Sequence, residues 1–225
     1  MIANYYSYFC TKIDKNDKIM KKLLMILLAV IPVSMWAQEN AWELPEFQEQ
    51  DTVESEKDNP NAKYLRGAVP VVDGKVVFTK TIKAPGKSAT QIYDILHNYI
   101  DRMTKASNQI HSLFVLEDTE NHRIGATFEE WLVFKKAALM LDQTRLYYVL
   151  EVNCKDGEAE VSFSRIHYLY DEYRKPQKLK AEEWITDDVA VNKKNTKLYP
   201  FMGKFRRKTI DRKDFIFNKF ESLLK

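Results

Sequence analysis

Cysteine is almost absent from this chain, which has only Cys10 and Cys154 among 225 residues. A segment that resembles a secretory signal lies between them, so an exported form would keep Cys154 alone. A lone cysteine cannot form an internal disulfide. Cys154 falls on the same alternate positions as the apolar residues of a strand-like run, so we expect it to pack in the core. A catalytic thiol would need a partner base, and the sequence points to none.

Motifs of catalysis and metal binding are also missing. No segment resembles a nucleophile elbow. The four histidines lack the short-range spacing of a zinc motif. We therefore expect neither enzymatic activity nor a metal or cofactor site. The histidines are His97, His111, His122 and His167.

One segment resembles a phosphate-binding loop without completing it. Gly86-Lys87-Ser88 stands between a predicted strand and a predicted helix, but Thr81 occupies the position of the first glycine of the motif. Without that glycine the backbone amides cannot readily wrap around a phosphate. We interpret the segment as a turn followed by a helix cap.

Charge is nearly balanced overall, with a formal net charge of +3, but it is unevenly distributed. The stretch Gln38–Lys63 contains eight acids and two lysines, whereas Val191–Lys225 contains eleven Lys and Arg against three acids. Such asymmetry can indicate a charged partner. We favour the simpler explanation that these are solvated surfaces, or two ends of one molecule that balance each other.

The N-terminal region predicts export. Residues Met20–Lys22 form a charged start, followed by fifteen uncharged residues, Leu23–Ala37. This is the layout of a signal peptide over residues 20–37, with cleavage after Ala37. The apolar run is shorter than the about 20 residues of a membrane span, and Pro32 interrupts it; a retained anchor is the alternative. Residues 1–19 are interpreted as a mis-annotated extension.

After cleavage the chain is expected to be soluble, in the periplasm or elsewhere in the cell envelope. Residues 38–63 are acidic and polar, so they cannot bury enough apolar surface to offset the cost of ordering. They are predicted to form a flexible linker. Residues 64–225 are predicted to form a single α+β domain, with no transmembrane segment in the mature chain.

The predicted domain is organised around three strand-like runs between Arg123 and Tyr170, in which apolar positions alternate. Ser88 and Gln91 form a capping box that opens an amphipathic helix over about 89–103. The order of elements is β-α-β-β-β-β-α. It predicts a curved antiparallel sheet of about five strands with two main helices on one face. The remaining elements are strands over 74–82 and 112–117, short helical turns within 181–192 and a final helix over about 209–224.

Two interpretations fit Glu129 and Glu130 in the first meander strand. In a regular strand, Glu130 points toward the core, where an unpaired carboxylate is costly. An extra residue at this point would make a β-bulge, release both acids from the core and bend the sheet. We favour the bulge, which would leave a groove between the bent sheet and its helices.

A cationic cluster precedes the predicted final helix. Positive charge at a helix start opposes the helix dipole, so we do not expect it to stabilise the helix. It could meet anionic lipid headgroups, an acidic partner or the acidic linker of its own chain. The predicted basic partner surface consists of Lys204, Arg206, Arg207 and Lys208.

Three stretches resemble an uncharacterised family of exported proteins, described as having a fold like that of the TATA-binding protein (TBP-like). They are VPVVDGKVVFTKTIKAPGKSATQIYD, AEEWITDD and KLYPFMGKFRRKTIDRKDFIFN, and the similarity extends from Val69 to Asn218. The resemblance implies the fold but no established activity, cofactor or catalytic residue. It does not imply DNA binding, because fold does not determine function and an exported protein does not meet DNA.

Two hypotheses follow from different classes. The first is a non-catalytic envelope domain that binds a protein or a surface. The second is a carrier of a small apolar ligand in the groove between sheet and helices. An enzyme is the third and weakest hypothesis. The residues predicted to line the ligand groove are Phe128, Trp131, Tyr148 and Phe163.

Overall fold

The computed structural model describes residues 60–137 and 140–225. The predicted extension, signal peptide and nearly all of the linker lie outside the described residues. Within them, Ala62–Tyr64 forms a short 3-10 helix. Lys63 Nζ lies 2.7 Å from Asp211 Oδ1, which ties this first turn to the last helix of the chain.

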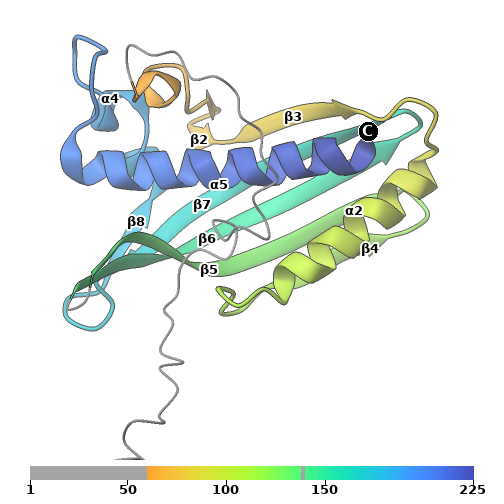
Figure 1. The fold of residues 1–225 in the computed structure, drawn as a ribbon, viewed down its shortest axis with the longest axis horizontal. Coiled ribbons are helices and arrows are strands. Elements are labelled where there is room, and N and C mark those ends of the chain that lie inside the picture. The colour runs from red at the N-terminus through yellow and green to blue at the C-terminus, as the bar shows by residue number, and fades with distance from the viewer. Residues whose placement is uncertain (1–59, 138–139) are drawn as a thin grey trace, which may run out of the picture. The chain divides into compact units, whose positions relative to one another are not determined.

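An antiparallel sheet of six strands forms the framework (Figure 1). Its centre is the meander of β5 (Arg123–Ala137), β6 (Met140–Lys155) and β7 (Glu158–Tyr170). The strand order is β3-β7-β6-β5-β4, and β8 also pairs with β7. The outer strands are β3 (Phe78–Lys83), β4 (Leu113–Asp118) and β8 (Gln177–Lys180), and β1 (Val71–Val72) pairs with β2 (Lys75–Val76) in a separate small sheet.

The two main helices lie on the same face of the sheet, as Figure 1 shows. They are α2 (Ala89–Thr104) and α5 (Pro200–Leu224). Two single turns, α3 (Ala181–Trp184) and α4 (Asp187–Ala190), lie between β8 and α5. This confirms the predicted α+β class, with antiparallel strands and helices on one side. The added elements are the β1–β2 hairpin and β8.

Local sequence signals explain several boundaries. The Ser88 side chain accepts a hydrogen bond from the Gln91 N–H, and the Gln91 side chain accepts one from the Ser88 N–H, so the predicted capping box is present. Lys155 pairs with Glu158 across a tight turn. Gly157 in that turn has a φ of 77°, a conformation that costs glycine little.

Helix α5 begins at Pro200, nine residues before the predicted start near Thr209. Proline suits the first turn of a helix, because its missing N–H has no partner there in any case. Gly203 lets this turn approach the preceding chain closely, since a Cβ at Gly203 would lie 2.8 Å from Leu198 Cβ. The final helix is therefore longer at its start than the sequence predicts.

The predicted bulge at Glu129-Glu130 is wrong in the main sheet. These residues pair in continuous register with Tyr147 and Leu146 of β6, and the irregularity lies between Val133 and Lys135. Glu130 consequently points into the core and is fully buried. Its carboxylate accepts hydrogen bonds from Arg212 of α5, at 2.7 Å from Nε and 2.8 Å from Nη2.

This ion pair connects the long helix to the centre of the sheet. Arg212 is only 3% exposed and also donates to Tyr148 Oη at 3.3 Å. Burial alone would lower the pKa of Arg212, but the adjacent Glu130 carboxylate raises it above its usual value. The pair satisfies two charges that would otherwise be costly in the core.

No helix within residues 60–137 and 140–225 combines the length and the apolar character needed to cross a membrane.

Candidate functional site

The two faces of the sheet differ in cover and chemistry. Helices α2 and α5 cover one face (Figure 1), where alternate residues such as Leu146, Leu150 and Val152 are buried. The side chains between them, such as Glu151 and Asn153, point to the opposite face because strand residues alternate. We call this opposite side the open face.

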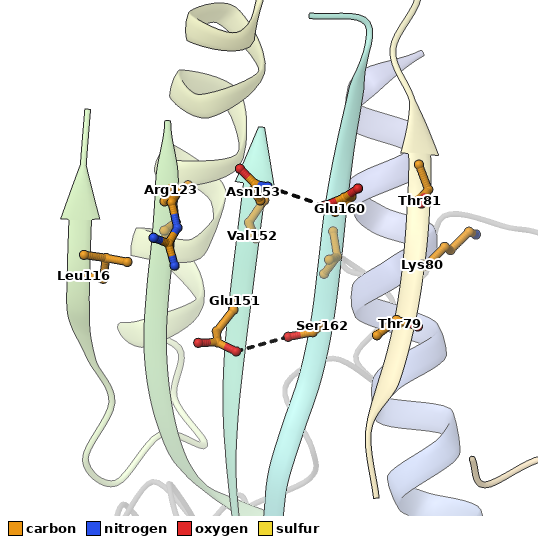
Figure 2. A pocket seen from close by; sticks show the side chains of 12 residues that line it. Thr79, Lys80, Thr81, Leu116, Arg123, Glu151, Val152, Asn153, Glu160 and Ser162 are labelled. Atoms are coloured by element: carbon orange, nitrogen blue, oxygen red, sulfur yellow. Dashed lines mark hydrogen bonds between the residues drawn. The ribbon is translucent and has the colours of Figure 1, made fainter. Parts of the chain in front are cut away.

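A shallow depression of about 430 Å³ lies on the open face. Figure 2 shows its side chains projecting from adjacent strands, with Glu151 and Asn153 on β6 and Ser162 on β7. Most of the groups around it are polar. The depression is lined by Thr79, Lys80, Thr81, Leu116, Arg123, Ile124, Glu151, Val152, Asn153, Glu160, Val161 and Ser162.

Much of the hydrogen-bonding capacity of this depression is unused. Arg123 makes no hydrogen bond or ion pair through its side chain within the described part of the chain. Glu151 accepts a single long bond from Ser162 Oγ, at 3.4 Å. Glu160 accepts a hydrogen bond from Lys155 Nζ at 2.9 Å, and this contact lowers the pKa of its carboxyl. The depression therefore brings the side chains of Glu151 and Glu160 together with the guanidinium of Arg123.

Strand β4 forms the edge of the sheet beside the depression. Among the described residues it pairs with β5 alone, so its second edge has no neighbouring strand. Leu113, Val115 and Leu116 are 40%, 56% and 39% exposed. The register shifts between Phe114 and Leu116, and a Cβ at Gly125 of β5 would meet Leu116 Cβ at 3.1 Å. Glycine thus permits the close approach of the irregular edge strand.

A charged cluster occupies the other end of the open face. Arg145 Nη1 donates to Glu129 Oε1 at 2.7 Å, and the same guanidinium pairs with Glu172. It also lies 5.3 Å from the Trp131 ring centre. Tyr147 Oη donates to Glu129 at 2.9 Å. Burial and this hydrogen bond raise the pKa of Tyr147, so its hydroxyl stays protonated.

The predicted ligand-groove residues do not form a groove. Phe128, Tyr148 and Phe163 are at most 2% exposed. Tyr148 stacks on Phe128 at 4.8 Å and on Phe163 at 4.2 Å between ring centres, so these rings fill the space proposed for a ligand. Trp131 belongs to the charged cluster on the open face.

The predicted basic partner surface is not an open patch either, because one of its four residues is buried and the other three are half-buried. Arg206 is fully buried. Its guanidinium donates to the backbone carbonyls of Tyr64, Leu65 and Ile185, each at 2.6 Å, and to Asp187. Arg206 therefore joins α5 to the N-terminal turn and to α4.

The other three residues of that set also contact the domain itself or are partly covered. Lys204 Nζ lies 2.7 Å from Asp142 Oδ2 and donates to Tyr170 Oη at 3.0 Å. Phenylalanine rings surround the same ammonium at 4.6–5.5 Å. Arg207 donates to Asn61 Oδ1 at 3.3 Å. Lys208 is half-buried.

Three of the histidines contact neighbouring side chains, and Cys154 is buried in the core. His97 contacts Glu117 at 2.7 Å, and His122 contacts Thr90 Oγ1 at 2.8 Å. His167 stacks on Tyr147 at 4.5 Å between ring centres. Burial raises the pKa of the Cys154 thiol to about 12. Across residues 60–137 and 140–225, no three His, Cys, Asp or Glu side chains converge as a metal site would require.

Sequence reasoning missed the polar depression and the cluster around Arg145. A signal was present, since polar residues alternate with apolar ones at 151 and 153 and at 160 and 162. Alternation predicts that such residues share one face of a sheet. It does not predict which strands lie next to each other around them.

Residues 78–169 match a sequence family described as "Domain of unknown function (DUF4468) with TBP-like fold". A solved DUF4468 family protein from Bacteroides ovatus ATCC 8483 is 43% identical. The similarity covers 73% of this chain and 94% of that protein, with a TM-score of 0.67. A solved TBP-like protein from Parabacteroides distasonis ATCC 8503 is 18% identical and covers 69% of this chain and 96% of that one. Its TM-score of 0.55 supports the fold alone.

No curated protein matches this chain. The family match and the 43% identity to a solved member over most of both chains confirm the resemblance that the sequence motifs indicate. The chain belongs to the DUF4468 family, whose fold is TBP-like and whose function is unknown.

Proposed function

We propose that this protein is a non-catalytic, exported recognition domain that binds an extended segment of a protein partner along strand β4. The observation that carries the proposal is the outer edge of β4 beside the polar depression, which pairs with no strand of residues 60–137 and 140–225. An extended segment can add to such an edge through backbone hydrogen bonds, while neighbouring side chains select its sequence. Here, exposed Leu113 and Val115 offer apolar contacts, and Arg123 and Glu151 offer charged ones.

The character of the edge supports this proposal. Solvent-exposed edge strands usually carry lysine, proline or other features that prevent pairing with another chain. The sequence of β4 is LFVLED, so its first four residues are apolar and its acids stand at one end. Its bulge between Phe114 and Leu116 limits pairing in part, which would favour one register over indiscriminate association.

The chemistry of the described side chains supports binding over catalysis. The buried Cys154 has a raised pKa, which disfavours the reactive thiolate. Arg145 holds Glu129 in an ion pair, so that carboxylate is not placed as a free general base. The depression carries both acids and bases, unlike the cationic platform that nucleic acid requires.

Site-specific photo-crosslinking in the cells that make the protein tests the proposal. A photoreactive amino acid at Leu116 should yield a discrete adduct with one protein. The same group at Asp94, an exposed residue of α2, should not. Val115→Lys places a charge on the edge and should abolish the adduct, while the matched exposed substitution Val71→Lys should leave it unchanged.

Equal adducts from Leu116 and Asp94 would contradict the proposal. So would an adduct at Leu116 that survives Val115→Lys, because a bound strand would have to accommodate that lysine at its pairing edge.

A further inference from the structure

A second surface combines exposed apolar and basic side chains, and it lies at the opposite end of β5 from the residues that pair with β4. It begins at the hairpin between β5 and β6, where Ala137 pairs with Met140 and Lys136 pairs with Leu141. Met140 and Leu141 are 55% and 52% exposed. Two large apolar side chains therefore stand in solvent directly beside lysines.

The loop after β7 adjoins this hairpin. Tyr170 at the end of β7 pairs with Thr144 of β6. The start of β6 and the loop after β7 line one depression of about 550 Å³. The loop is a tight turn, since the N–H groups of Arg174 and Lys175 both donate to the Asp171 carbonyl, at 3.1 and 3.0 Å. It presents Tyr173 with 83% of its surface exposed. We call Lys135–Ala137, Met140, Leu141 and Tyr173–Lys175 the hairpin end.

Nearby carboxylates have cationic partners. Asp142 pairs with Lys204, and Glu172 pairs with Arg145. Asp171 lies 3.7 Å from Arg174.

The lysines at this surface outnumber the carboxylates that could pair with them. The side chains of Lys135, Lys136 and Lys175 form no ion pair with any residue that the structure describes. The hairpin end therefore carries uncompensated positive charge around its exposed apolar side chains.

We propose that the hairpin end is a docking site for an anionic lipid surface. Exposed apolar side chains next to lysines can enter the boundary between headgroups and acyl chains, while the ammonium groups meet lipid phosphates. Tyrosine prefers this boundary because its ring is apolar and its hydroxyl stays hydrated. A second copy of the chain fits less well, because self-association through this surface would bring like charges together. The β4 edge is not required for this contact.

Vesicle flotation tests the apolar part of the site. The protein is purified in its processed form from the cells that make it. It is mixed with vesicles of phosphatidylcholine and phosphatidylglycerol, or of phosphatidylcholine alone. A double variant with Met140→Ser and Leu141→Ser should bind the anionic vesicles at least about tenfold more weakly. The pair Val71→Ser and Val72→Ser, at residues that are 50% and 54% exposed, should leave binding unchanged.

A second pair of variants tests the charges. Lys135→Gln and Lys136→Gln together should weaken binding to anionic vesicles about 25-fold, at about fivefold for each lysine near an anionic surface. The matched pair Lys193→Gln and Lys194→Gln, at exposed residues outside this surface, should change it much less. All variants keep the same N-terminus, so a difference between them arises from the substituted residues.

Equal binding of all variants to anionic vesicles would overturn the proposal. So would equal binding of the unsubstituted protein to vesicles with and without phosphatidylglycerol. If the protein ignores vesicles but forms a dimer that the substitutions at Met140 and Leu141 dissociate, the occupant is a second copy and the lipid proposal fails. Each substituted side chain at the hairpin end is exposed, so the variants should fold.

Discussion

The ion pair between Glu130 and Arg212 is expected to stabilise the fold only while both partners are present. Replacing Glu130 with Leu leaves a buried guanidinium without its carboxylate, and replacing Arg212 with Met leaves a buried carboxylate without its cation. Loss of one partner of a buried pair costs about 3–5 kcal/mol. Each single variant should therefore lose about that much free energy of unfolding.

The double variant should be more stable than either single one. Two apolar side chains of similar size remove both charges, and replacements of this kind are often nearly neutral. Asn108 and Gln109 also donate to Glu130, and leaving them unsatisfied costs about 1–3 kcal/mol. The expected loss in the double variant is therefore about 1–3 kcal/mol.

Urea unfolding followed by circular dichroism measures these free energies. The exposed pair Lys155 and Glu160 provides a control, because surface ion pairs contribute little and their removal should not move the midpoint measurably. The reasoning is refuted if the double variant loses as much stability as the two single variants added together. That result would mean that the two charges do not compensate each other.

Three further predictions concern single side chains. Gly203→Ala should destabilise the protein by about 1–3 kcal/mol in urea unfolding, because the new Cβ would overlap Leu198; unchanged or higher stability would contradict the geometry. Lys204→Met should cost about 1–3 kcal/mol because it leaves the half-buried Asp142 carboxylate without its cation. Lys193→Met, at an exposed lysine, is the comparison in the same assay, and equal losses from the two changes would refute this. The pKa of Cys154 is raised from 9.0 to about 12 in the folded state, so the unfolded chain binds fewer protons between these values, and stability should fall as pH rises through them. At pH 10 the free energy of unfolding of the wild type should have fallen by about 1.4 kcal/mol more than that of Cys154→Val, with both proteins measured in the presence of reductant. Identical pH profiles of the two proteins would show that the folded-state pKa is not raised.

Periodicity along the chain was sufficient to predict the framework. The meander and α2 follow from alternating apolar residues, from the capping box at Ser88 and from the turn at Gly157, all of which are local signals. The start of α5 was predicted too late, although Pro200 at its first turn is itself a recognisable signal.

Long-range partners explain the remaining differences. The sequence favours a bulge at Glu130 because an unpaired carboxylate in the core is costly, but its partner Arg212 lies 82 residues further along. Arg206 was assigned to a basic surface because it stands among other cations. Its actual partners include the backbone carbonyls of Tyr64, Leu65 and Ile185. Backbone acceptors carry no sequence signature, so this role could not be predicted from residue types.

The candidate site was less predictable than the fold. Alternation indicates that Glu151 and Asn153 share a face, but the depression also requires Arg123 and Thr79 from strands distant in the sequence. Its position beside β4 depends on the strand order β3-β7-β6-β5-β4. The sequence contains no local signal that places β4 at the edge.

Native mass spectrometry most directly tests the claim that this is a recognition domain with a filled interior. The protein is purified gently from the cells that make it. Phe128, Tyr148 and Phe163 pack against one another and fill the interior. We therefore expect the bare mass of the chain, alone or in complex with a protein partner. A stoichiometric small-molecule mass that disappears on denaturation would contradict it and identify the protein as a carrier.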